Sequence, residues 1–221
     1  MSDNNQIKKL AKQVGQYPTT PGNRRRYFDH TLNSLVVWVG EGDCYISSSP
    51  YEVLSTLLGS CVAVCMRDPE ICTGGMNHFL LPENPSSDDE LPSFALRYGS
   101  HAIESLTNAL VSRGAQRSRI EVKVFGGANI RNIGNGWGHA NANFVENYLK
   151  RERLNVLASD LRGTQPRRLR YFPATGRAQL SKNSEVPVTT LAAKEFRLAK
   201  KLKREKDRSS IEIFDPRVSV K

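Results

Sequence analysis

The feature that most constrains the fold is an apolar run directly after a Gly-Ser pair. Residues 61–66 read Cys-Val-Ala-Val-Cys-Met and follow Gly59 and Ser60. Successive side chains of a strand point to opposite faces of its sheet, so a strand that is apolar at every position is buried on both faces. We therefore expect residues 61–66 to form a strand in the core, with other elements covering it from two sides.

The chain is long enough to form such a core unaided. It has 221 residues, of which 38% are hydrophobic, and it needs neither disulfide bonds nor a metal for stability. Its four cysteines are few for this length and are expected to be free thiols. Residues 1–16 are polar, and no apolar run approaches the ~20 residues of a membrane helix. We predict a cytoplasmic protein without membrane insertion.

The net charge of +10 lies mainly at the two ends of the chain. Residues 1–30 carry six basic and two acidic residues, and residues 181–221 carry eleven and six, whereas the part between them carries fifteen and fourteen. A nucleic-acid-binding fold would present a basic patch on its folded body. Charged ends are more typical of solvated tails or weak docking arms, so we do not expect a nucleic-acid partner.

Hydropathy patterns predict strands in the first third of the chain and alternating strands and helices after it. This order favours an α+β fold in which mixed β-sheets are layered with helices. We expect a flexible basic arm at 1–30, one domain at 31–182, and a C-terminal helix and strand at 183–221 that pack on the same domain. The expected strands are 34–39, 44–47, 54–58, 61–66, 74–81, 120–124, 155–159, 169–172, 178–180 and 211–214; the expected helices are 96–113, 144–153 and 190–206, with a glycine-rich loop at 134–138.

A cysteine and a histidine in neighbouring apolar segments are the best candidates for chemistry. Cys61 follows Gly59-Ser60, where backbone N–H groups near the sulfur could form an oxyanion site. His78 comes seventeen residues later in a second apolar strand. If the two strands pair through a turn at Asp68-Pro69, thiol and imidazole could meet, and the imidazole would then activate the sulfur as a nucleophile.

The residues alone leave other interpretations open, and the simplest is structural. A buried free cysteine usually behaves as a small hydrophobe, and a histidine in an apolar strand is usually a core residue with satisfied hydrogen bonds. A zinc site is a further alternative, because Cys61, Cys65, Cys72 and His78 are four possible ligands. The spacing argues against zinc, since structural sites use closely spaced cysteines on turns, whereas Cys65 lies inside the expected strand.

Several segments occur in an order and spacing that resemble the CheD family of chemoreceptor glutamine deamidases. The similarity extends from about residue 26 to residue 215. The segments are Leu58-Gly-Ser-Cys-Val-Ala-Val64, Gly74-Gly-Met-Asn-His-Phe-Leu-Leu-Pro82, Phe125-Gly-Gly-Ala128, Asn141-Ala-Asn-Phe-Val145, Asp160-Leu-Arg-Gly163 and Arg167-Arg-Leu-Arg-Tyr-Phe-Pro-Ala-Thr-Gly-Arg177.

The resemblance implies a layered fold similar to bacterial toxin-type deamidases and a specific site. Cys61 would be the nucleophile and His78 the base. The family's third member is a hydroxyl residue six positions before the cysteine, which here is Ser55, with Thr56 beside it, so either could serve. Oxyanion or substrate contacts are expected from Gly59, Ser60, Asn77, Phe125 and Gly126, with neither metal nor cofactor.

The resemblance also implies a reaction and partners. The expected activity is hydrolysis of selected glutamine side chains to glutamate on methyl-accepting chemotaxis receptors, through a cysteine thioester and with release of ammonia. A CheC-type phosphatase is a possible second partner. The alternative is a regulatory module without catalytic activity that binds receptors or such a phosphatase.

Overall fold

The computed structural model describes residues 25–81, 93–130 and 136–182, together with eight residues of a C-terminal helical stretch. These eight are Ala193, Glu195, Arg197, Leu198, Lys200, Lys201, Leu202 and Arg204. Most of the expected basic arm and the expected strand at 211–214 lie outside the described residues.

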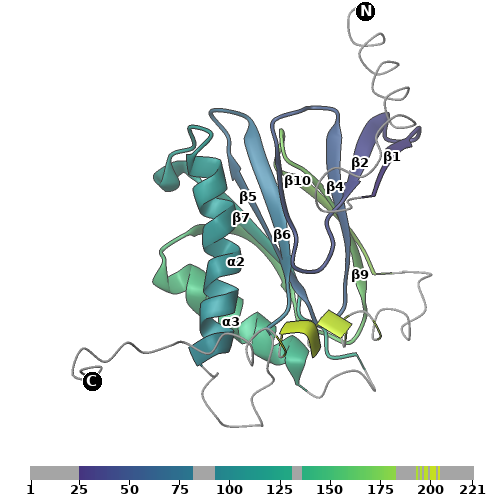
Figure 1. The fold of residues 1–221 in the computed structure, drawn as a ribbon. Helices are drawn as coiled ribbons and strands as arrows, with labels where there is room; N and C mark the ends of the chain where they lie inside the picture. The colour runs from purple at the N-terminus through teal and green to yellow at the C-terminus, as the bar shows by residue number, and fades with distance from the viewer. Residues whose placement is uncertain are drawn as a thin grey trace, which may run out of the picture.

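Two five-stranded sheets lie face to face, and two helices cover the outer face of one of them (Figure 1). The first sheet has the order β1 (Arg26–Asp29), β2 (Ser34–Trp38), β4 (Glu52–Leu58), β9 (Arg167–Phe172) and β10 (Arg177–Ser181). The second has the order β3 (Cys44–Ser47), β6 (Thr73–Phe79), β5 (Val62–Asp68), β7 (Glu121–Gly126) and β8 (Asn155–Leu161). The helices are α2 (Ser93–Val111) and α3 (Trp137–Arg151), and a short 3₁₀ turn spans Arg117–Arg119.

Both sheets are mixed. One neighbouring pair in each sheet is parallel, β2 with β4 and β7 with β8, and all other pairs are antiparallel. The prediction of an α+β fold built from layered mixed sheets is therefore confirmed.

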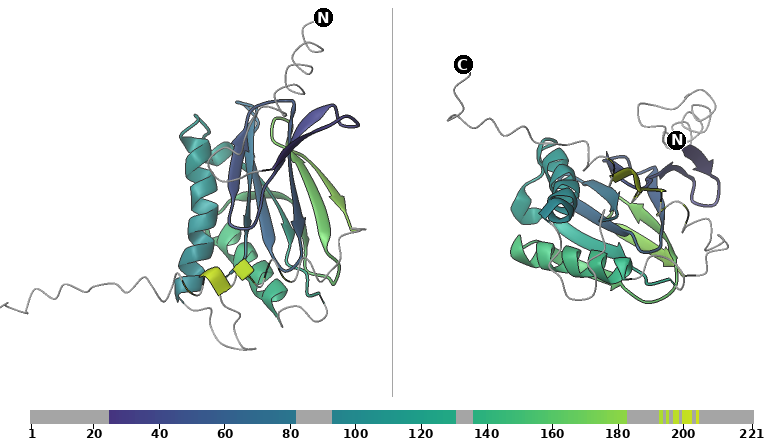
Figure 2. Two further views of the ribbon diagram at one scale, coloured as in Figure 1. Left: turned by 45° about the vertical axis from the view of Figure 1, so that its right-hand side comes forward. Right: turned by 60° about the horizontal axis from the view of Figure 1, so that its bottom comes forward.

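Strand β5 lies at the centre of the second sheet and is buried from both sides, as its apolar run predicts. Its residues Val62, Val64 and Met66 pack in the layer that also holds the apolar side chains of α2 and α3. Ala63 and Cys65 pack in the other layer, between the two sheets. Figure 2 shows this order of layers, with the helices on one side of the second sheet and the first sheet on the other.

Two elements begin where the sequence predicts irregular structure. Strand β1 falls within the expected flexible arm at 1–30. It pairs antiparallel with β2 at the edge of the first sheet, and its four partly exposed residues, Arg-Tyr-Phe-Asp, give no alternating hydropathy signal. Helix α3 begins at Trp137, inside the expected glycine-rich loop. Gly138 lets the start of this helix pack closely against the backbone of Ala128, because a Cβ atom at this position would clash with that backbone.

Across the described parts of the chain, every helix is too short or too polar to cross a lipid bilayer.

Candidate active site

The strand register brings Cys61 and His78 to the same face of the second sheet. Cys61 directly precedes β5, and Ala63 lies opposite His78 on β6. Side-chain alternation then directs Cys61, Ala63 and His78 into the layer between the two sheets, with Cys61 diagonal to His78. Burial is the main cause of the raised pKa of the Cys61 thiol and of the lowered pKa of His78, and the carboxylates of Glu41 and Glu195 act on both groups.

A hydroxyl from the other sheet orients the imidazole. The Thr56 hydroxyl donates to the carbonyl oxygen of Val39 over 2.7 Å, and its Oγ1 lies 2.8 Å from His78 Nδ1. The hydroxyl proton of Thr56 is already donated to the Val39 carbonyl. The contact between Thr56 Oγ1 and His78 Nδ1 is therefore a hydrogen bond in which Nδ1–H donates to Oγ1. The Nε2 atom then carries the lone pair; it is buried and forms no hydrogen bond within the described residues.

Burial keeps this imidazole neutral. His78 is almost completely buried, and this burial lowers its pKa from the ordinary value, although neighbouring carboxylates act in the opposite direction. A neutral ring with a free Nε2 has the protonation state of a general base.

Thr56, and not Ser55, contacts His78. The two hydroxyl residues are adjacent on β4, so their side chains point to opposite faces of the first sheet. Leu54 and Leu58, which have the same parity as Thr56, lie in the cluster between the sheets. The Ser55 hydroxyl is buried on the far face and has no hydrogen-bond partner among the described residues, so its position gives no support to the alternative in which Ser55 orients the histidine.

The Cys61 thiol is fully buried, and the structure favours its protonated form. Burial raises the pKa of this thiol well above its usual range, and the nearby carboxylate of Glu195 raises it further. A thiol with a raised pKa stays protonated near neutral pH unless a neighbouring base takes its proton.

The backbone around Cys61 is held by the glycine-rich turn after β7. The N–H of Gly127 donates to the carbonyl of Cys61, and the N–H of Ala128 donates to the carbonyl of Gly59, both over 2.8 Å. Gly126 has a φ of +117°, and a Cβ atom there would collide with the Cys61 carbonyl. Gly59 and Gly126, which were predicted as substrate contacts, therefore help to pack the backbone around Cys61. Phe125, also predicted, lies in the same apolar cluster as Cys61.

Two asparagines near the site form hydrogen bonds to backbone groups of neighbouring elements. Asn77, predicted as a substrate contact, is turned toward α2 by strand alternation; it accepts from the Val64 N–H, donates to the carbonyl of Ala102 and lines the pocket beside α2. Asn141, which we did not predict as a site residue, donates to the carbonyl of Ser60 over 3.0 Å and accepts from the N–H of Leu81 over 2.8 Å. Its position in a segment shared with the CheD family is the only sequence signal for it.

Glu195 is the second site residue that sequence reasoning missed. Its side chain is fully buried, and its carboxylate accepts from the Ser60 hydroxyl over 2.6 Å and from the Cys61 N–H over 3.3 Å. The predicted residue Ser60 therefore contributes a hydroxyl donor beside the cysteine. A single acidic residue within a lysine-rich helix gave no sign of this contact.

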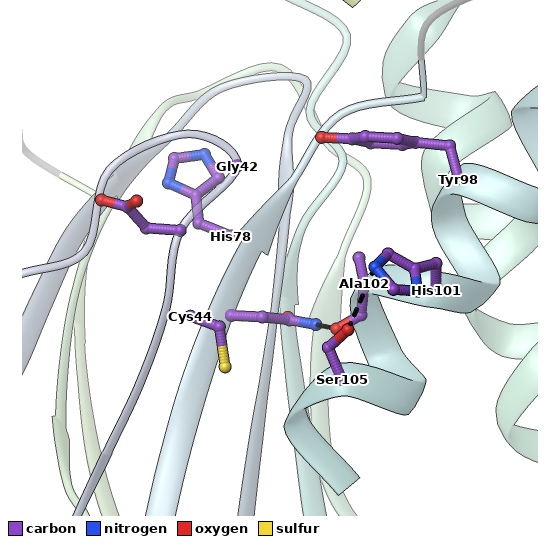
Figure 3. A pocket seen from close by; sticks show the side chains of 9 residues that line it. Gly42, Cys44, His78, Tyr98, His101, Ala102 and Ser105 are labelled. Carbon is purple, nitrogen blue, oxygen red and sulfur yellow. Dashed lines mark hydrogen bonds between the residues drawn. The ribbon is translucent and has the colours of Figure 1, made fainter. Parts of the chain in front are cut away.

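A pocket adjoins the site at the edge of the second sheet (Figure 3). The loop after β2 is fixed to β6 on both sides of the histidine, because the Gly42 N–H donates to the carbonyl of His78 and the His78 N–H donates to the carbonyl of Asp43. Tyr98 and His101 on α2 line the opposite wall in Figure 3.

The four possible zinc ligands are spread along the β5–β6 hairpin. Cys61 lies at one end of β5, whereas Cys72 is exposed in the turn at the other end and has a positive φ. In the described ranges of the chain, no three side chains of histidine, cysteine, aspartate or glutamate gather as they would around a metal ion.

Comparison with known proteins shows which family the chain belongs to. The family model described as CheD chemotactic sensory transduction matches residues 80–182. A Rhodopseudomonas palustris protein named probable chemoreceptor glutamine deamidase CheD is 49% identical over 160 residues, covering 72% of this chain and 75% of that protein. The chain belongs to the CheD family. CheD proteins with the same name from Methylobacillus flagellatus and Saccharophagus degradans are 39% and 37% identical, and the matches cover 85% and 89% of this chain and 94% of each relative.

Among solved structures, a Neisseria meningitidis protein of family-model DUF152 superposes with a TM-score of 0.37 at 11% identity, over 58% of this chain and 64% of that one.

Proposed function

We propose that this CheD-family protein hydrolyses glutamine side chains of chemotaxis receptors to glutamate, with Cys61 as nucleophile and His78 as general base. The observation that carries the proposal is the chain of hydrogen bonds from Val39 through Thr56 to His78, which leaves Nε2 unprotonated on the face that also holds Cys61. The relatives' names supply the class of substrate.

In the first half of the reaction, His78 Nε2 takes the proton of the Cys61 thiol as the sulfur attacks the carboxamide carbon. The Cys61 N–H and the Ser60 hydroxyl donate hydrogen bonds to the oxygen that becomes negatively charged. The imidazolium returns its proton to the departing nitrogen, so ammonia leaves and a thioester remains.

In the second half, the neutral imidazole accepts a proton from water, and the hydroxide attacks the thioester carbon. The C–S bond breaks, and the sulfur recovers its proton from His78. The new carboxyl group is released and loses its remaining proton to water, which gives a glutamate side chain. Thr56 holds the ring in the required tautomer during both halves. A hydroxyl is a weaker orienting group for this task than the buried carboxylate of a serine protease triad.

Replacing the nucleophile tests the proposal. Cys61→Ala should lower the rate of glutamine conversion in a purified receptor cytoplasmic fragment by at least ~10³-fold, measured by mass spectrometry of receptor peptides. Cys65→Ala is the matched control, because Cys65 is equally buried, lies on β5 four residues after Cys61 in the same layer between the sheets, and has no role in the mechanism.

Undiminished conversion by Cys61→Ala would show that the nucleophile is assigned wrongly. If neither the natural protein nor the variants convert glutamine, yet receptor signalling still depends on the protein, the alternative of a non-catalytic regulatory module is correct.

A further inference from the structure

The carboxylate of Glu195 occupies donors that the proposed reaction needs. Ser60 Oγ and the Cys61 N–H, which would stabilise the substrate's carbonyl oxygen, donate to the two oxygens of Glu195 in this structure. Glutamate is also what a substrate glutamine becomes after hydrolysis. The side chain at position 195 thus has both the chemistry of the product and contacts that a product would make.

The burial of this carboxylate needs an explanation. A carboxylate removed from water is unfavourable by several kcal/mol unless it is paired. None of the ion pairs found among the described residues includes Glu195, and its hydrogen-bond donors are the two groups beside the nucleophile. A side chain whose only role was to anchor the C-terminal stretch would be better apolar.

The C-terminal stretch presents Glu195 from one face of a helix. Glu195, Leu198 and Leu202 are spaced three and four residues apart and point inward, with Leu198 packed on the cluster that contains Cys61. The other described residues of the stretch are exposed: Ala193, Arg197, Lys200, Lys201 and Arg204. Figures 1 and 2 show these residues in yellow at one end of the sheets.

We propose that the C-terminal helix binds in the substrate site of its own chain, with Glu195 as an internal product mimic that a receptor helix must displace. This inference rests on the proposed function and extends it in two ways. The site would recognise a glutamine presented by a helix with apolar residues three and seven positions later, and the resting protein would be partly self-inhibited. Glu195 also contributes to the raised pKa of the Cys61 thiol, so displacement would favour the thiolate.

The decisive experiment converts the mimic into a substrate. In Glu195→Gln, the introduced carboxamide would be attacked by Cys61 and hydrolysed by water, so position 195 should be recovered as glutamate with loss of one ammonia per chain. The rate should be independent of protein concentration, because the reaction is intramolecular. Peptide mass spectrometry at successive times after purification reads the conversion directly.

Two controls accompany this variant. The double variant Glu195→Gln/Cys61→Ala should keep its amide at position 195. Gln116 and Gln179 are exposed glutamines of the same chain and should remain unchanged. If the amide at 195 persists while the natural protein converts receptor glutamines, the product-mimic inference is wrong and the proposed function stands. If both conversions fail, both are wrong.

A second variant measures the inhibition itself. Glu195→Ala should lower the KM for the receptor fragment and speed the alkylation of Cys61 by iodoacetamide, each by roughly tenfold, because the internal competitor binds more weakly. A loss of receptor conversion in this variant would instead make Glu195 a participant in the reaction and would overturn its assignment as an inhibitor.

Discussion

The hydroxyl of Thr56 determines which nitrogen of His78 carries a proton. Its own proton is committed to the Val39 carbonyl, so it can only accept from Nδ1. A hydroxyl without this second partner could rotate and donate to Nδ1, which would leave the proton on Nε2 and remove the base. The tautomer of the imidazole therefore depends on the main-chain carbonyl of Val39, the residue after β2.

Adjacent substitutions on β4 test this positioning role. Thr56→Val keeps the shape of the side chain but removes the hydrogen bond, so we expect kcat to fall by about 10- to 100-fold and the acidic limb of the pH profile to shift. Thr56→Ser should restore most of the activity. Ser55→Ala should leave kcat and the pH profile unchanged, because its hydroxyl has no partner within the described residues. Equal losses in Thr56→Val and Ser55→Ala would contradict the assignment.

The turn after β7 is hydrogen-bonded to the backbone around Cys61. Gly127 and Ala128 donate to carbonyls on both sides of Ser60, and the Gly126 carbonyl itself accepts from Arg167 over 2.7 Å. Arg167 also lies 2.7 Å from Asp160, so the turn is connected to β8 and β9 as well as to the cysteine.

Two glycine substitutions distinguish the effect of a steric collision on stability from the effect of backbone strain. Gly126 and Gly114 both have positive φ, +117° and +94°, but only at Gly126 would a Cβ atom meet the Cys61 backbone. Gly114→Ala should lower the free energy of unfolding by about 1 kcal/mol. Gly126→Ala should lower it by roughly 3 kcal/mol or more and should also reduce kcat. Urea denaturation with receptor assays measures both, and similar unfolding free energies for the two variants would refute the close-contact argument.

The second sheet is the middle layer of the molecule and contributes to both of its apolar clusters. One apolar cluster joins that sheet to the helices, and the other, which includes Cys61 and Tyr171, joins it to the first sheet. The Tyr171 hydroxyl also donates to the carbonyl of Met66 across the interface over 3.2 Å. Because β5 contributes to both clusters, loss of either layer exposes the strand that carries the site.

This arrangement predicts that the layers unfold together. The chain has two tryptophans, Trp38 on β2 in the first sheet and Trp137 at the start of α3. The variant Trp38→Phe keeps Trp137, which packs on the cluster between the two sheets, and Trp137→Phe keeps Trp38, which packs on a separate small cluster beside the first sheet. Their fluorescence should follow the same urea dependence as the far-UV circular dichroism of the same variant. Separate fluorescence and circular dichroism transitions within either variant would show that a layer unfolds by itself.

Hydropathy periods determined most of the elements without the structure. The runs that became β2 and β5 are visible because burial on one or both faces leaves a local pattern in consecutive residues. Strand β1 gave no such pattern because its edge position leaves it partly exposed. Cys61 and His78 were also recognisable, since each lies in a short segment typical of a family.

Only the tertiary structure decided how the site is completed. Thr56 is 22 residues from His78, and Glu195 is 135 residues from Ser60, so neither contact leaves a periodic signal in the chain. The choice between Thr56 and Ser55 follows from which face of β4 is turned toward the second sheet, and both residues are fully buried. Sequence patterns report burial, whereas the partner of a buried polar group depends on which surfaces the fold brings together.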